Sequence, residues 1–288
     1  MARLGDQVRA ASRALADAGV ASPSHDAREL AAFVLGEPRY PVLEPDALPE
    51  GFDAEFADVV ARRAAREPLQ HIVGYTVFRH VTLTVDPAVF VPRPETEVVA
   101  GVAIDEALLL TGAGRAALVV DLCSGSGAIA ASLDVEAPDA TVVAVDASQD
   151  AVRMTRSNRA TVGAIGGRTE LGDVGDSSLL ADLNGTIDIV VSNPPYIPPG
   201  AIPRDPEVRE HDPQLALFGG GEDGLEIPRA VIAAAARLLR PGGLFVMEHA
   251  DVQGESAREA AEATGVFTAI ETRQDLTGKD RMLVARRR

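Results

Sequence analysis

The sequence is poor in cysteine and has no long apolar run, and each absence excludes a class of protein. Cys123 is the single cysteine among 288 residues, so an internal disulfide framework is excluded and a reducing compartment is expected. No uninterrupted apolar run reaches the roughly 18 residues that a membrane-spanning helix needs. Residues 1–6 also lack the charged-then-apolar order of a secretory signal. We therefore expect a cytoplasmic protein that does not bind membranes.

Positive charge is also scarce. Lysine and arginine together number 27 against 43 aspartates and glutamates, for a formal net charge of −16. Sequence-independent nucleic-acid binding depends on Lys and Arg neutralising phosphates, so stable binding of DNA or RNA is not expected. Arg62, Arg63 and Arg66 form a local exception on one predicted helix. They predict either a solvated helix face or a small basic surface for a partner, and the sequence leaves both open.

The chain is predicted to have three parts. Apolar residues at helical spacing predict three short N-terminal helices, at about residues 3–18, 24–35 and 53–66. We assign residues 1–70 to this small helical domain, with Ser24 as the N-cap of its second helix, and residues 71–92 to a β-hairpin linker. In residues 93–288, β-type strands alternate with helices, which is typical of an α/β domain. We predict seven strands, five of them in βα units, with the last one reversed.

A glycine turn in this domain predicts a nucleotide site. A strand ending near Asp121 leads through Gly125 and Gly127 into a helix, and a second strand ends at Asp146. The glycines permit a tight turn and close approach of a ligand to the backbone. An acid at the position of Asp146 can accept hydrogen bonds from both hydroxyls of a ribose. The pattern favours an adenosine-type ligand over a purely structural turn.

The glycine turn does not by itself identify the cofactor. Its spacing also fits a dinucleotide fingerprint, but a pyrophosphate requires helix N–H groups and often a nearby cation. Asp121 instead supplies a carboxylate at the end of the first strand, which favours a sulfonium such as S-adenosylmethionine. Asp173, after the third strand, is expected to accept from the adenine amino group, with Val174 packing on the ring. The alternative for Asp173 is an N-cap of a helix predicted from Asp176.

The segment Asn193-Pro194-Pro195-Tyr196 follows the buried strand predicted at residues 187–192. Ligands of open α/β sheets bind just beyond the carboxyl ends of the strands. Two prolines make this segment stiff and leave carbonyl oxygens at set angles. A planar NH₂ group can then be held by the Asn193 side-chain oxygen and the Pro194 carbonyl while it packs on Tyr196. The alternative is a simple strand-ending turn.

Two further segments flank this site in the sequence. Residues 91–97, Val-Pro-Arg-Pro-Glu-Thr-Glu, precede a helix predicted to run to about Leu110, and they form either a lid or a rigid linker. Residues 197–221 are predicted to be irregular. So long a stretch inside a compact domain is usually functional or disordered, and we interpret it as part of a substrate channel.

Taken together, these motifs resemble the release factor glutamine methyltransferases, the PrmC/HemK family. The resemblance extends from about Glu67 to Arg281 and is carried by six stretches: residues 67–74, 91–97, 121–130, 191–197, 216–225 and 275–281. Asn-Pro-Pro-Tyr alone occurs in many amino-group methyltransferases, whereas its combination with the 91–97 stretch, the hairpin and a helical N-terminal domain is far more specific. Cys123 departs from the family pattern, which usually has glycine there.

The resemblance implies the fold and the reaction. The fold would be a seven-stranded, mostly parallel Rossmann-like sheet of a class I methyltransferase. S-adenosylmethionine would be the methyl donor, with S-adenosylhomocysteine as product. The acceptor would be the side-chain nitrogen N5 of the glutamine in the Gly-Gly-Gln motif of class I peptide chain release factors, a reaction that supports translation termination. The helical domain would help to hold the release factor.

The expected site residues follow from the motifs and the resemblance. No metal is expected. Catalysis is assigned to Asn193, Pro194 and Tyr196, and substrate binding to these three residues and Pro195. The expected cofactor-binding residues are Asp121, Cys123, Ser124, Gly125, Ser126, Gly127, Asp146, Asp173, Val174 and Asn193.

Three other functions share parts of this pattern. A nucleic-acid adenine-N6 methyltransferase uses the same four residues at 193–196, but the acidity of the chain weighs against it. A non-catalytic nucleotide-binding interaction module would use the glycine turn alone. An NAD-dependent oxidoreductase ranks last, because no hydride-transfer constellation accompanies the turn.

Overall fold

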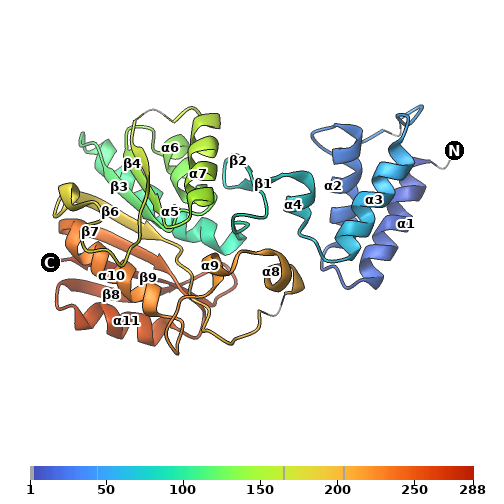
Figure 1. Ribbon diagram of the computed structural model, residues 1–288. Coiled ribbons are helices and arrows are strands. Elements are labelled where there is room, and N and C mark those ends of the chain that lie inside the picture. Colours follow the sequence, from blue (N-terminus) through green and yellow to red (C-terminus); the bar gives the residue numbers. More distant parts are fainter. Residues whose placement is uncertain (1–2, 44, 165, 204) are drawn as a thin grey trace. The chain divides into compact units, whose positions relative to one another are not determined.

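The computed structural model describes residues 3–43, 45–164, 166–203 and 205–288 (Figure 1). The chain divides into two compact units, Met1–Tyr75 with Pro203–His211, and Thr76–Ile202 with Asp212–Arg288. Met1 and Ala2, on which the prediction about a leader partly rested, lie outside the described residues. The predicted domain boundaries at residues 70 and 92 stay predictions.

The first unit is helical. Its apolar side chains form one core, in which Leu15 and Leu30 are fully buried and Phe52 stacks on Phe56 with ring centroids 5.3 Å apart. The predicted N-cap at Ser24 is wrong: helix α2 begins one residue earlier, because Pro23 fits the first helical position. The helices are α1 (Leu4–Asp17), α2 (Pro23–Leu35), α3 (Phe52–Ala64), α4 (Leu69–Val73) and α8 (Pro206–His211).

The three arginines near the end of α3 are paired with carboxylates rather than free. Arg62 donates two hydrogen bonds to Glu67. Arg63 bonds Asp26 at 2.8 Å and Glu207 at 2.9 Å, and Arg66 bonds both oxygens of Glu207. Both sequence interpretations, a solvated face and a basic docking surface, are therefore corrected. These charges are used in ion pairs within the unit, and two of the pairs, Arg63–Glu207 and Arg66–Glu207, hold α8 at the end of α3.

We expect Glu207→Gln to destabilise the first unit by about 2 kcal/mol, because Arg63 then loses a partner in a buried network. Burial opposes ionisation of Glu207, but the hydrogen bonds from Arg66 and Arg63 outweigh it and lower the pKa of Glu207 from 4.5 to about 2. A carboxylate whose folded pKa is depressed stabilises the fold above its unfolded pKa. This contribution is thus complete above pH 4.5 and disappears as the pH falls toward 2. Urea unfolding at several pH values measures it.

The matched control is Glu210→Gln. Glu210 lies on the same helix and pairs with Arg209, with both side chains more than 40 % exposed. Exposed pairs contribute about 0–1 kcal/mol, so this variant should unfold like the unmodified chain. Equal stabilities for the two variants at pH 7 would contradict the assignment.

The hairpin is shorter than predicted. Its strands are β1 (Tyr75–Phe78) and β2 (Val81–Thr84), whereas residues 72–73, predicted as strand, belong to α4. Gly74 ends that helix with φ +79°, a conformation that glycine adopts without cost. Residues 72–73 therefore belong to a helix, although their apolar pattern alone predicted a strand.

The second unit is built on a seven-stranded sheet with the order β5-β4-β3-β6-β7-β9-β8. The pairings β3–β4, β3–β6, β4–β5 and β6–β7 are parallel, and β9 is antiparallel to both β7 and β8. The predicted seven-stranded, mostly parallel sheet with one reversed strand is confirmed. The strands are β3 (Leu118–Leu122), β4 (Thr141–Asp146), β5 (Arg168–Leu171), β6 (Ile187–Ser192), β7 (Leu239–Glu248), β8 (Phe267–Gln274) and β9 (Asp280–Arg287).

Helices cover both faces of this sheet, and each face has its own apolar core (Figure 1). On one face α5 (Pro94–Gly112) and α6 (Ala128–Glu136) pack on the strands, with α7 (Gln149–Thr161) beside α6. On the other face lie α10 (Glu226–Leu238) and α11 (Gly254–Ala263). Because helices cover both faces of the sheet, the sequences of the central strands are mostly apolar along their whole length. In β6 all six residues are buried.

Two loop predictions are corrected. No α-helix starts at Asp176: residues 173–180 form turns, followed by a short 3₁₀ segment, Ala181–Leu183. The stretch 197–221 is not wholly irregular. It contains α8, which belongs to the first unit, and α9 (Gln214–Leu217). Arg204 within the stretch lies outside the described residues.

Within the described ranges, none of the helices combines the length and the apolar character needed to cross a bilayer.

Candidate active site

The sheet register brings the predicted motifs to one edge. Leu122 pairs with Val145 on one side and with Ser192 on the other, and Ser192 pairs with Met247. The four strands β3, β4, β6 and β7 therefore end in one row, and each predicted motif begins directly after a member of that row. This edge is where open α/β sheets bind ligands.

The glycine turn between β3 and α6 needs its glycines for two different reasons. Cys123, Gly125 and Gly127 all have positive φ, at +61°, +56° and +81°. A Cβ on Gly127 would lie 2.9 Å from the Thr155 backbone Cα, so helix α7 leaves no room for a side chain. A Cβ on Gly125 would meet no protein atom within 4 Å, which leaves open space on the ligand side. Positive φ at Cys123 gives a physical reason for the glycine usual in the family.

Asp146 joins the glycine turn to the end of β4. Its Oδ2 accepts the Gly125 backbone N–H at 2.8 Å and its Oδ1 accepts the Ser148 N–H at 2.9 Å. Each carboxylate oxygen retains a further lone pair. Burial raises the pKa of Asp146, against the effect of these backbone hydrogen bonds. The arrangement leaves two acceptors that can take a vicinal diol.

Asp121 is a buried carboxylate without a hydrogen-bond partner among the described residues. Its side chain is fully buried and neither oxygen is hydrogen-bonded. Burial and the neighbouring charge of Asp146 raise the pKa of Asp121 to about 8, and the nearby Ala130 amide opposes this shift only in part. Unpartnered buried carboxylates are costly. A positively charged ligand group at this edge would relieve that cost.

Other predicted cofactor residues lie around the same turn. Ser124 and Ser126 are buried, and the Ser124 hydroxyl lies 3.2 Å from the Thr155 hydroxyl. Cys123 is partly exposed, and burial raises the pKa of its thiol. The raised pKa keeps the thiol neutral at neutral pH.

Asp173 and Val174 are the residues predicted to contact adenine. Asp173 is exposed and its Oδ1 accepts the Gly175 backbone N–H at 2.8 Å, so the alternative role as a helix N-cap is excluded with the missing helix. Val174 is partly exposed and packs against the core under α10. Asp173 and Val174 follow the end of β5, where Leu171 pairs with Asp146 of β4.

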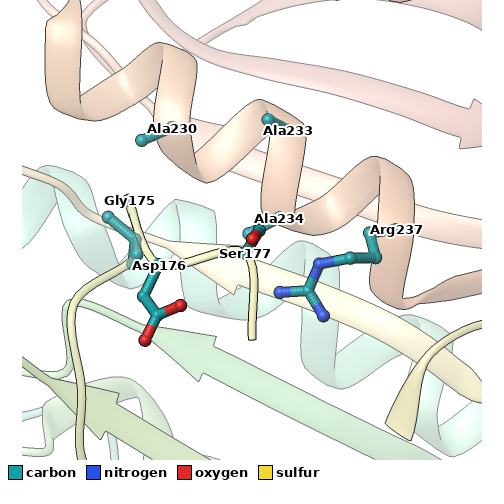
Figure 2. Close-up of a pocket in the computed structure, with 8 residues that line it drawn as sticks. Gly175, Asp176, Ser177, Ala230, Ala233, Ala234 and Arg237 are labelled. Atoms are coloured by element: carbon teal, nitrogen blue, oxygen red, sulfur yellow. The ribbon is translucent and has the colours of Figure 1, made fainter. Parts of the chain in front are cut away.

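Figure 2 shows side chains that line a hollow between the turn that follows β5 and helix α10. Small side chains line it, and Arg237 closes one end. Its volume is about 210 Å³, below the range of roughly 300–1,000 Å³ typical of ligand pockets. Neither Asp121 nor Asp146 lines it, whereas Val174, which is predicted to pack on adenine, does.

Asn193 is held by a hydrogen-bonded chain that the sequence did not predict. Its Nδ2 donates to Thr96 Oγ1 at 3.1 Å, and Thr96 Oγ1 donates to Glu248 Oε2 at 2.7 Å. The Tyr196 hydroxyl donates to the other Glu248 oxygen at 3.1 Å. Glu248 and Thr96 are only 1 % and 2 % exposed. Residues from α5 and β7 thus fix the side chains of Asn193 and Tyr196, which follow β6.

Hydrogen bonds also hold the backbone of the Asn-Pro-Pro-Tyr segment in place. The Tyr196 carbonyl accepts from Gln253 Nε2 at 2.8 Å, and Ile197 exchanges backbone hydrogen bonds with Leu217 and Gly219. Among the described residues no hydrogen bond reaches the Pro194 carbonyl or the Asn193 side-chain oxygen. These two acceptors, predicted to hold a planar NH₂ group, remain available.

The sequence missed Thr96 and Glu248 as site residues, although signals for both existed. Glu248 is an acidic residue that ends an apolar strand at the carboxyl edge. Thr96 lies in the 91–97 stretch, which is neither a free lid nor a plain linker: Pro94 begins α5, and Arg93 pairs with buried Asp212 at 3.3 Å. Thr96 is therefore anchored in the first turn of a helix.

The strand order, the glycine turn and the acid after the second strand define a class I methyltransferase domain. Residues 101–203 match the family described as "Methyltransferase small domain", and residues 6–74 match the family described as "PrmC N-terminal domain". Among solved structures, a ribosomal protein L11 methylase from Lactobacillus delbrueckii subsp. bulgaricus is similar at 20 % identity and a TM-score of 0.48, covering 71 % of this chain and 84 % of that one.

Curated relatives are more specific. "Release factor glutamine methyltransferase" from Streptomyces coelicolor is 50 % identical, over 86 % of this chain and 85 % of its own length. The proteins of the same name from Bifidobacterium longum and Mycolicibacterium smegmatis are 44 % and 45 % identical, over 97 % and 100 % of this chain and 98 % and 99 % of theirs. The chain belongs to the release factor glutamine methyltransferase family.

Proposed function

We propose that this protein transfers a methyl group from S-adenosylmethionine to the side-chain amide nitrogen of the glutamine in the Gly-Gly-Gln motif of class I peptide release factors. The observation that carries the proposal is the fixed carboxamide of Asn193. Its NH₂ end is bonded to Thr96, so its oxygen is the end left for a substrate amide. The names of the relatives agree with this reaction, and neither alternative, an adenine methyltransferase or a non-catalytic nucleotide-binding module, is favoured by them.

The donor set at the strand edge fits S-adenosylmethionine. Asp121 is an orphaned buried carboxylate and so fits a cationic ligand. Asp146 offers two acceptors for the ribose hydroxyls, and the open side of Gly125 admits a ligand close to the backbone. Asp173 and Val174 would hold the adenine, and Cys123, Ser124, Ser126 and Gly127 shape the turn. Bound there, the cofactor supplies an electrophilic methyl group on a sulfonium.

The chain's own residues orient the acceptor. An amide nitrogen is a poor nucleophile because its lone pair is delocalised into the carbonyl. The Asn193 side-chain oxygen and the Pro194 carbonyl would accept the two N–H groups of the glutamine, while Tyr196 packs on the flat amide and Pro195 keeps the segment stiff. Such positioning can supply several kcal/mol, and acceptors placed in advance stabilise the positive charge that develops on nitrogen. The proton leaves afterwards to water.

The partners and location follow from the substrate. The protein substrate would be a release factor, held in part by the helical domain that we place at residues 1–70, followed by the 71–92 linker and the 93–288 catalytic domain. Release factors act on ribosomes, so we place the enzyme in the cytoplasm. Stable nucleic-acid binding is not part of the proposal, and salt-dependent binding of RNA or DNA by the purified chain would contradict this point.

Mass spectrometry of a release factor incubated with the chain and S-adenosylmethionine tests the proposal. We expect one methyl group on the Gly-Gly-Gln glutamine. A release factor with asparagine in place of that glutamine is the control and should gain none, because the shortened side chain does not reach the two acceptors. An unmodified glutamine after prolonged incubation with a folded, cofactor-binding enzyme would overturn the assignment.

A further inference from the structure

Three hydrogen bonds link Asn193, Thr96, Glu248 and Tyr196. When Glu248 is ionised, each of them has only one possible donor. An ionised carboxylate accepts hydrogen bonds and donates none. Thr96 has a single hydroxyl proton and must give it to Glu248, 2.7 Å away. The lone pairs of Thr96 then face Asn193, and only the NH₂ end of the Asn193 amide can point at them, at 3.1 Å. The opposite orientation would set two acceptors against each other.

We propose that Glu248, acting through Thr96, decides which end of the Asn193 carboxamide faces the substrate, and that both are positioning residues for methyl transfer. The inference rests on the function proposed above and adds two residues to it. Neither residue needs to touch the glutamine. Their role is to keep an acceptor, rather than a pair of N–H donors, directed at the substrate N–H groups.

The groups around Glu248 set its pKa, and with it the pH at which its protonation state changes. The groups that face it are Thr96 and Glu95 from α5, Tyr196 from the loop after β6, and Arg281 from β9. Burial raises the pKa of Glu248 to about 7, in concert with the charge of Glu95 and against Arg281 and the two hydroxyl donors. Asp275 holds the Arg281 guanidinium at 3.1 Å. Glu248 therefore titrates close to neutral pH.

Protonation of Glu248 removes the directionality. With the proton on Oε2, the carboxyl donates a hydrogen bond of its own to Thr96 Oγ1, which frees the Thr96 proton to point at Asn193. The Asn193 amide can then turn over and present N–H groups to the N–H groups of the substrate. We expect kcat to fall below pH 7, with the ionised form of Glu248 as the active one.

The first test compares Thr96→Val with Thr96→Ser. Valine keeps the shape of the side chain and removes the hydroxyl, whereas serine keeps the hydroxyl. We expect kcat to fall by about 30-fold for valine, because a misdirected acceptor is a loss of positioning, and by less than about 3-fold for serine. The dissociation constant for S-adenosylmethionine, measured by calorimetry, should stay the same in both.

The second test uses NMR of the chain without cofactor. The ¹⁵N shift of the Asn193 side-chain amide should titrate near pH 7 in the unmodified chain and in Thr96→Ser. It should be independent of pH in Thr96→Val and in Glu248→Gln. Glu248→Gln should also lose the acid limb of the kcat profile, because glutamine does not ionise.

These measurements separate the inference from the proposed function. If the unmodified chain methylates no release factor, the function fails, whereas the Asn193 titration still reports on the hydrogen-bonded chain. Equal kcat values for the valine and serine variants would overturn the inference. So would a ¹⁵N shift of the Asn193 side-chain amide that does not change with pH in the unmodified chain. A melting temperature above the assay temperature for each variant excludes simple unfolding as the cause of lost activity.

Discussion

Replacing Asn193 by alanine is expected to lower kcat for release-factor methylation by about 100- to 1,000-fold, the size of effect seen when one preorganised group is removed from an active site. The variant loses the side-chain oxygen that accepts a substrate N–H and leaves the Pro194 carbonyl as the only acceptor. Single-turnover mass spectrometry gives the rate. Calorimetry with S-adenosylmethionine should show a nearly unchanged affinity, because the acids that would hold the cofactor lie on β3 and β4 and after β5, not in the segment after β6.

The matched control is Asn184→Ala. Asn184 accepts from Arg237, and both side chains lie at an exposed position away from the strand edge. This variant should retain full activity. A normal kcat in Asn193→Ala combined with weakened cofactor binding would reverse the roles assigned to the two parts of the site.

The second large effect is expected for Asp146→Ala. We expect the dissociation constant for S-adenosylmethionine to rise by at least about 100-fold, because two hydrogen bonds to a charged acceptor are lost, each typically worth about 1.5–3 kcal/mol. The same substitution frees the backbone N–H groups of Gly125 and Ser148, which loosens the glycine turn. At saturating cofactor, kcat should change much less than affinity does. Calorimetry and a cofactor titration of the rate measure the two effects.

Two further acids serve as comparisons for Asp146. Asp150 lies in the next helix, exposed and paired with Arg153, so Asp150→Ala should leave cofactor affinity unchanged. Asp173 is exposed and would make a single hydrogen bond to adenine, so Asp173→Ala should weaken binding by no more than about 10-fold. A larger loss from Asp173→Ala than from Asp146→Ala would move the main anchor of the cofactor from the ribose to the base.

Local patterns predicted the parts of the site that lie within one βα unit. The turn at Gly125 and Gly127 and the acid at Asp146 were visible because strand, glycines and helix follow each other at short spacing. Helix α8 was missed because no long apolar periodicity marks a helix of six residues. Its place in the first unit depends on Glu207, whose partner Arg63 lies 144 residues earlier in the chain. Local patterns do not report such pairings.

The sequence by itself determined what lies at the carboxyl ends of the strands. These are β-branched strands that must be buried on both faces, glycines that permit a tight turn after the first of them, and acids and a proline-stiffened carboxamide at the strand ends. Only the tertiary structure decided how that carboxamide points. Thr96 and Glu248 are 152 residues apart, and they meet because β6 and β7 are adjacent strands beneath α5. The direction of a hydrogen bond depends on which donor and acceptor are brought together, and here the strand order and the packing of α5 on the sheet bring them together.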